Sequence, residues 1–193
     1  MDVELFRFED ETALARLSRA VEERLIEHGG RHRPVVFACV GTDRSTGDAL
    51  GPLVGERLRR LGCGEDQVIG TLESPLHALN LDERLGPALD DGSDRLVVAV
   101  DAALGPLDRV GGVSLHGRGL RPGQGVGKDL PEVGELSLTA TVNVQAGALD
   151  VQVLQSTRLW LVQGLAELIG SASWWALTNL DRAEARAPAV SAA

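Results

Sequence analysis

Two aspartates, Asp48 and Asp101, have the residue type and the surroundings that acid–base chemistry needs. Asp48 stands in a Gly-rich stretch after one apolar run, at 35–40, and Asp101 directly follows another, at 96–100. An aspartate among small apolar residues is partly desolvated, which raises its pKa, and a second carboxylate nearby raises it further. Two such groups can share one proton, so that one acts as a base on water and the other as an acid.

Each aspartate also has a purely structural interpretation, which the sequence leaves open. Asp48 could cap the helical pattern that follows it, and Asp101 could cap a turn at the end of a strand.

Two other kinds of site, a phosphate loop and a serine hydrolase, fit the sequence less well. The Gly-rich stretch 41–52 has neither a Lys followed by Ser or Thr nor a GxGxxG pattern, which disfavours a phosphate loop. The chain has no GxSxG pattern of a serine hydrolase.

Hydrophobic periodicity predicts the elements that must position these residues. The expected helices span 11–28, 49–61, 76–89 and 151–169, and the expected strands span 35–40, 68–72, 96–100, 112–116 and 136–144. Because helices alternate with apolar strands, the pattern predicts a three-layer αβα sandwich with a mostly parallel, mixed sheet. We expect a single α/β domain over 1–170 and a flexible C-terminal tail over 171–193.

The expected fold brings the two aspartates to a shared site. In open α/β sheets, ligands bind beyond the carboxyl ends of the strands. If the strands at 35–40 and 96–100 are neighbours, about 5 Å apart, the segments that follow them bring Asp48 and Asp101 within reach of one water molecule.

Composition and charge restrict the partners of the chain. With 44% hydrophobic and 24% charged residues over 193 positions, the composition is globular. The formal net charge of -9 disfavours nucleic acid and anionic membranes, and would suit a basic protein or peptide. Neither Cys39 nor Cys63 belongs to a CxxC pair. Since no apolar leader or membrane-length stretch is present, we expect a cytoplasmic protein.

Four stretches of the sequence carry a family resemblance. They are GTDRSTGDALGPLVG at 41–55, ESPLHALNL at 73–81, VDAALG at 100–105 and PGQGVGKDLPEVG at 122–134. In these stretches the chain resembles the YyaC-like sporulation proteins, often labelled spore proteases. That family is similar to the germination protease and, more remotely, to the hydrogenase-maturation endopeptidases.

The resemblance implies a phosphorylase/hydrolase-like αβα fold and a role for both aspartates. Asp48 matches one catalytic aspartate of the germination protease, and Asp101 matches the other. The hydrogenase-maturation enzymes use a Glu, an Asp and a His as metal ligands; here Asp48 takes the Glu position, and no His is assigned. We therefore expect no metal and no cofactor.

The resulting hypothesis is an aspartate-dependent endopeptidase that acts during sporulation or germination, in the sporulating cell or forespore. Backbone N–H groups near Gly123, Gly125 and Gly127 would bind the oxyanion or the substrate backbone. Arg44 and Lys128 would orient the carboxylates or the substrate. Two alternatives remain open: a non-catalytic peptide-binding protein of the spore, and a metal-dependent maturation-type peptidase.

Overall fold

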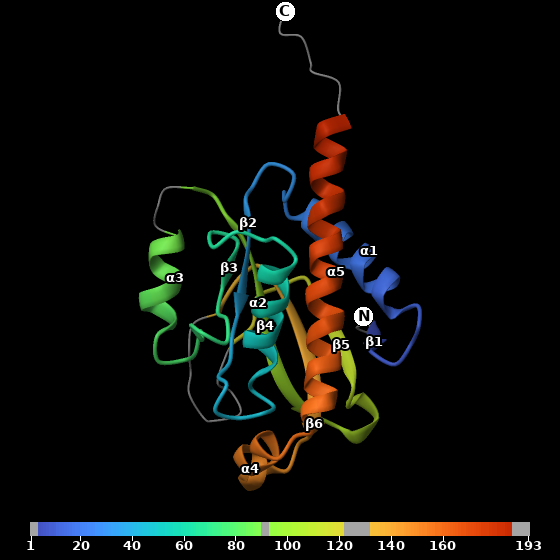
Figure 1. The fold of residues 1–193 in the computed structure, drawn as a ribbon, viewed down its shortest axis with the longest axis vertical. Coiled ribbons are helices and arrows are strands. Elements are labelled where there is room, and N and C mark those ends of the chain that lie inside the picture. Colours follow the sequence, from blue (N-terminus) through green and yellow to red (C-terminus); the bar gives the residue numbers. More distant parts are fainter. Residues whose placement is uncertain (1–3, 90–92, 122–131, 187–193) are drawn as a thin grey trace, which may run out of the picture.

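A six-stranded mixed sheet forms the centre of the computed structural model, which describes residues 4–89, 93–121 and 132–186 (Figure 1). The strand order is β1-β5-β6-β4-β2-β3. Strands β2, β3, β4 and β6 are parallel, whereas β5 is antiparallel to both β6 and β1. The strands are β1 (Leu5–Arg7), β2 (Val35–Cys39), β3 (Val68–Ile69), β4 (Leu96–Gly105), β5 (Gly112–His116) and β6 (Leu136–Val144).

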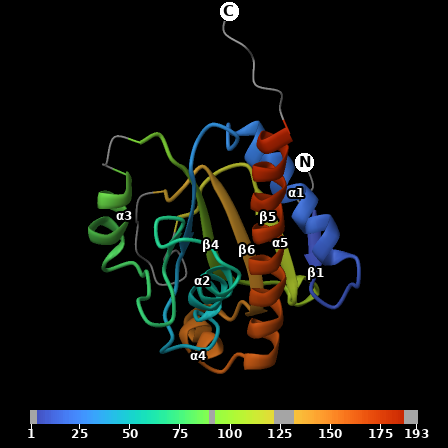
Figure 2. The ribbon, with the colours of Figure 1, turned by 45° about the horizontal axis from the view of Figure 1, so that its top comes forward.

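Helices cover the two faces of this sheet unequally. The helices are α1 (Ala13–Glu27), α2 (Leu50–Arg60), α3 (Leu81–Leu89), α4 (Asp150–Gln155) and α5 (Leu159–Arg186). One face packs against α1, α2 and α5, which lie together in both ribbon views (Figures 1 and 2). The other face carries α3, whose Leu81 and Leu85 pack over β2 and the first half of β4. The structure confirms the expected three-layer α/β arrangement with a mixed sheet.

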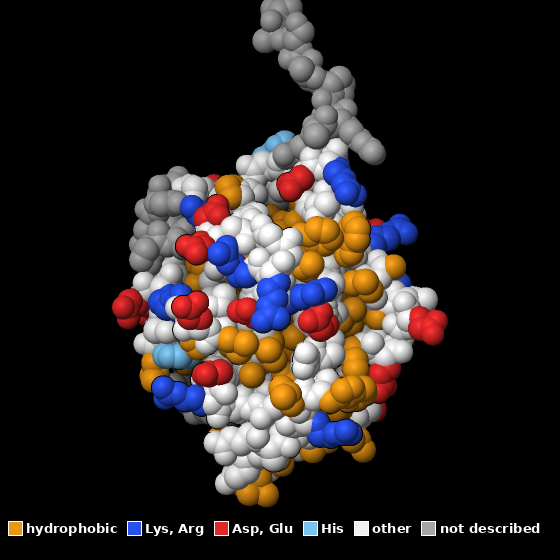
Figure 3. Space-filling view, viewed as in Figure 1, with side chains coloured by type: hydrophobic (Ala, Val, Ile, Leu, Met, Phe, Trp, Pro, Cys, Tyr) orange, Lys and Arg blue, Asp and Glu red, His pale blue; other side chains and the backbone are white. Residues whose placement is uncertain are grey.

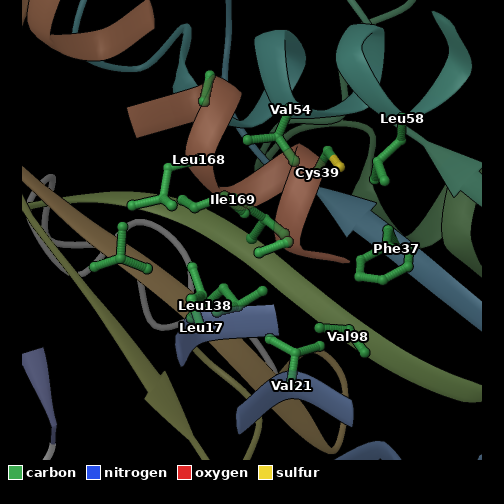
Figure 4. Close-up of a cluster of buried hydrophobic side chains, with 14 of the residues drawn as sticks. Leu17, Val21, Phe37, Cys39, Val54, Leu58, Val98, Leu138, Leu168 and Ile169 are labelled. Atoms are coloured by element: carbon green, nitrogen blue, oxygen red, sulfur yellow. The ribbon is translucent and has the colours of Figure 1, made fainter. Parts of the chain in front are cut away.

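The larger core lies under α1, α2 and α5 (Figure 4). The apolar strand β2 supplies side chains to both faces: Phe37 and Cys39 point into the larger core, and Val36 and Ala38 into the smaller one. This two-sided burial explains why β2 is continuously apolar. Strand β6 instead alternates, with Leu136, Leu138, Ala140 and Val142 in the larger core.

The neighbouring strands β2 and β4 form the centre of the sheet. They pair in register from Val35 opposite Leu96 to Cys39 opposite Val100. From β2 the chain passes outward to β3 and then returns to the opposite side of β2 as β4. Such a reversal of strand order opens a crevice at the carboxyl ends of the two strands.

The expected end of the last long helix at Gly170 is wrong. The segment 151–169 is two helices, α4 and α5, and α5 continues to Arg186. Gly170 does not terminate the helix; it packs closely against α2, because a Cβ there would lie 2.7 Å from Cγ of Arg57. Beyond it, Leu180 is buried and Asn179 Nδ2 donates a hydrogen bond to Glu22 Oε2 in α1, at 2.9 Å. The tail expected over 171–193 is therefore helical as far as Arg186.

Two smaller expectations also differ. The helix expected over 76–89 begins at Leu81, because 76–80 forms a bridge and a turn beside β2. Strand β1 was not expected from its short, mixed sequence. Within the described residues, none of the helices has the length and apolarity needed to cross a membrane. On the face shown in Figure 3, acidic and basic side chains are interspersed among apolar ones.

The continuation of α5 can be tested at Leu180, which is 3% exposed. Replacing this side chain with Ala should lower the free energy of unfolding by about 2–5 kcal/mol, because it leaves a cavity in the core. Each kcal/mol should lower Tm by about 2–4 °C at this chain length. Leu159→Ala, at a position of the same helix that is 57% exposed, is the matched control and should melt close to wild type. Equal melting of both variants would contradict the docking of α5 past Gly170.

Candidate active site

A pocket of about 950 Å³ lies at the carboxyl end of the sheet and brings Asp48 and Asp101 together. Its walls come from the loop after β2, the segment before α3, the second half of β4, the end of β5, the first half of β6 and α4. The side chains that the argument uses are Asp48, His77, Asp101, His116, Ser137 and Thr139.

The loop that carries Asp48 is held against the end of β2. Gly41 has φ +146°, and a Cβ there would lie 1.9 Å from the carbonyl oxygen of Asp48, so the position requires glycine. Thr42 N–H donates to that same oxygen at 3.1 Å, which closes the loop. Gly47 N–H donates to the carbonyl oxygen of Leu154 at 2.8 Å, which ties the loop to α4.

Asp48 is not a helix cap. The N-cap position of α2 is Ala49, and no side chain makes a capping hydrogen bond there. The carboxyl group of Asp48 is therefore not needed for the start of the helix, and it lines the pocket.

Asp101 lies inside β4 and not after it, which corrects the expected strand end at Val100. It stands one residue past the last pair of β2 with β4, at the point where β2 has ended. Strand β4 continues because β6 still pairs with it, and Asp101 is opposite Thr139. Oδ1 of Asp101 accepts a hydrogen bond from Ala102 N–H at 2.8 Å. The aspartate is thus at the carboxyl edge of β2 while it is held rigidly by β4 and β6.

Burial determines the ionisation of this pair. It raises the pKa of Asp101 to about 8, with a smaller contribution from the charge of Asp48. Burial also raises the pKa of Asp48, and the nearby Ser45 hydroxyl opposes that shift. The opposition is weak, since within the described part of the chain Ser45 Oγ makes no well-formed hydrogen bond. Near neutral pH the pair therefore favours a protonated Asp101.

The floor of the pocket is the polar face of β5 and β6. Ser137 and Thr139 alternate with the core residues of β6, and both line the pocket with His116 of β5. Nε2 of His116 lies 3.2 Å from Oγ1 of Thr139. Burial, and then the positive charges of Arg118 and Arg109, lower the pKa of His116. The alternation of polar and apolar residues along β6 is visible in the sequence, but it predicts only a strand with one polar face and not a functional site.

His77 also lines the pocket. It lies in the segment before α3, where its N–H donates to Asn80 Oδ1 at 2.8 Å. Its Nδ1 accepts a hydrogen bond from Leu79 N–H at 3.3 Å. The second of these hydrogen bonds holds the imidazole ring from one side.

The remaining site predictions receive less support. Arg44 is exposed and does not belong to the described lining of the pocket. Gly123, Gly125, Gly127 and Lys128 lie outside the described residues. Among the residues that the structure does describe, no three His, Cys, Asp or Glu side chains converge as a metal site would require. This donor set does not fit the metal centre of the maturation enzymes.

Comparison with known proteins places the chain in a family. Residues 5–172 match the family model described as "Protein of unknown function (DUF1256)". The uncharacterized protein YyaC of Bacillus subtilis (strain 168) is 43% identical over 154 residues, which cover 80% of this chain and 73% of YyaC.

A solved structure shows the same fold. The crystal structure of the NiFe hydrogenase maturation protease HycI from Thermococcus kodakarensis KOD1 superposes with a TM-score of 0.52 at 18% identity. The match covers 83% of this chain and 99% of HycI. The resemblance to YyaC is confirmed, as is the more remote likeness to the maturation proteases at the level of the fold. The chain therefore belongs to the DUF1256 family.

Proposed function

We propose that this chain is an endopeptidase in which Asp48 and Asp101 activate a water molecule. The observation that carries the proposal is the meeting of two partly buried carboxyl groups in one pocket, from two neighbouring parallel strands. Their pKa values are both raised by burial, which is a feature of functional carboxylate pairs. The fold shared with a maturation protease agrees with this proposal.

The two groups have different roles. The ionised carboxylate of Asp48 takes a proton from the water, whose oxygen attacks the carbonyl carbon of the peptide. The protonated Asp101 gives its proton to the leaving nitrogen as the C–N bond breaks. Asp101 is the acid because burial raises its pKa to about 8, so that it still holds a proton at neutral pH.

The proposed substrate is a protein or peptide. The net charge of -9 favours a basic segment, since the summed field of the chain attracts cations. By the family resemblance, the activity belongs to sporulation or germination, in the cytoplasm of the sporulating cell or the forespore.

Loss of either carboxyl group should abolish turnover while folding persists. Purified protein is incubated with spore extract, and released peptides are identified by mass spectrometry. Asp48→Asn and Asp101→Asn should each reduce the rate by about 10²–10⁴-fold. The double variant should be hardly worse, because the pair acts as a unit. Asp43→Asn, at an exposed position of the same loop, is the matched control.

Three results would redirect the proposal. Cleavage that survives Asp101→Asn would contradict it. Peptide binding by the double variant, without cleavage by wild type, would favour a binding protein. Inhibition by a chelator would favour a metal-dependent peptidase.

The raised pKa of Asp101 should appear in the pH dependence of stability. Because about 8 exceeds the ordinary value of 3.8, folding favours the protonated form. Its contribution to the free energy of unfolding is complete below pH 3.8, falls as pH rises and is lost above about 8. Asp101→Asn should therefore gain stability relative to wild type as pH rises from 3.8 to about 8, by at most about 1.4 kcal/mol per pH unit, and no further above that. Urea unfolding measures this difference, with Asp43→Asn as control; curves that stay parallel would refute the assignment.

A further inference from the structure

Three polar side chains cross the floor of the pocket on successive strands. Asp101 of β4 is opposite Thr139 of β6, and residues opposite each other on adjacent strands share a face. On the next strand, β5, His116 pairs with Ser137 and reaches Thr139, with 3.2 Å between Nε2 and Oγ1. All three side chains line the pocket. Thr139 is thus the neighbour of both titratable groups.

His116 also borders a second cavity, of about 520 Å³, between α1 and the edge of the sheet. Exposed side chains line this cavity, so it reaches the surface. Its charged lining consists of Glu4, Glu23, Arg24, Glu27 and Arg118. The three glutamates are paired with Arg16, Arg19 and Arg24, so their charges are largely compensated.

We propose that Thr139 and His116 form a proton relay. After each turnover the relay returns a proton to Asp101 from the side of the second cavity. The proposal rests on the proposed function, in which Asp101 has just given its proton to the leaving nitrogen. His116 is among the lining residues of both cavities, so in this proposal the second cavity supplies the proton while the substrate or product fills the main pocket.

The transfer balances as a chain of single protons. Oδ1 of Asp101 accepts a hydrogen bond from Ala102 N–H, and Thr139 is the residue opposite Asp101 on β6, so in the proposed relay Oδ2 receives the proton. The Thr139 hydroxyl proton passes to Oδ2, and Thr139 Oγ1 takes the proton from Nε2 of His116. Nδ1 of the ring then takes a proton from water, so the imidazole stays neutral. Asp48 releases to solvent the proton that it took from the attacking water, so the cycle consumes none.

The surroundings of His116 suit this role. A relay needs a neutral ring, because imidazolium has no free lone pair to accept a proton. Burial and the charges of Arg118 and Arg109 lower the pKa of the ring, which keeps it neutral at physiological pH. In this proposal Thr139 is a positioning residue, because it lies opposite Asp101 on the neighbouring strand and its hydroxyl contacts His116.

The hydroxyl of Thr139 provides the first test. Thr139→Val keeps the shape and removes the hydroxyl, so kcat should fall by about 100-fold with KM unchanged. Thr139→Ser should restore kcat. Thr141→Val, on the same strand and outside the described lining of the pocket, is the matched control. An unchanged kcat in Thr139→Val would overturn the relay.

Chemical rescue separates a relay from a structural role. His116→Ala should lose kcat to a similar extent, and added imidazole should restore it from the second cavity. His32→Ala, exposed at the amino end of β2, should behave as wild type. A His116→Ala variant that melts like wild type, loses activity and is not rescued would overturn the proposal.

A measurement without turnover distinguishes this proposal from the proposed function. The ¹⁵N shifts of His116 report its tautomer and its titration. Asp101→Asn should change them, and this change should vanish when Thr139→Val is added. If the wild-type protein cleaves no peptide, the proposed function fails, and the ¹⁵N shifts alone test whether His116 is coupled to Asp101 through Thr139. If the ¹⁵N shifts of His116 are the same in wild type and Asp101→Asn, the relay is overturned. A change in these shifts that requires the Thr139 hydroxyl supports it.

Discussion

The early end of β2 beside a longer β4 is the constraint on which the site depends. Both strands run in parallel through the core, but β2 stops at Cys39 while β6 pairs with β4 as far as Gly105. Asp101 is the first residue of β4 past this step. It has the rigidity of a central strand and the position of a strand end. The loop from the end of β2 returns over the same step and carries Asp48 into the pocket.

The unequal cover of the sheet explains why this edge is polar. The larger core under α1, α2 and α5 takes the apolar half of β6, while α3 covers β2 and the first half of β4 on the other face. Beyond α3, the side chains of Asp101, Thr139 and His116 line a pocket instead of a core. Burial of an unpaired carboxylate is costly, and here its pKa shift is the visible consequence. The apolar face supplies the stability that lets the polar face hold such a group.

Local pattern was sufficient for much of the fold. Strands β5 and β6 have the bounds that their alternation predicts, and β2 and β4 were expected from their apolar runs. Hydrophobic periodicity predicted the wrong helix end where a residue packs against a partner that is distant in the sequence. The pattern predicted a helix that ends at 169, yet α5 continues and Gly170 packs against Arg57 of α2. A side chain 113 positions away in sequence leaves no local signal.

The sequence by itself determined the αβα class, which follows from the alternation of apolar strands and helices along the chain, and it predicted that Asp48 and Asp101 meet if their two strands are neighbours. The strand order of the fold met that condition. The tertiary structure decided which other groups join them. Thr139 and His116 reach Asp101 only through the order β5-β6-β4, in which a strand late in the chain inserts between two earlier ones. Strand order depends on how whole elements pack against each other. For that reason no window of sequence around His116 could reveal its neighbours.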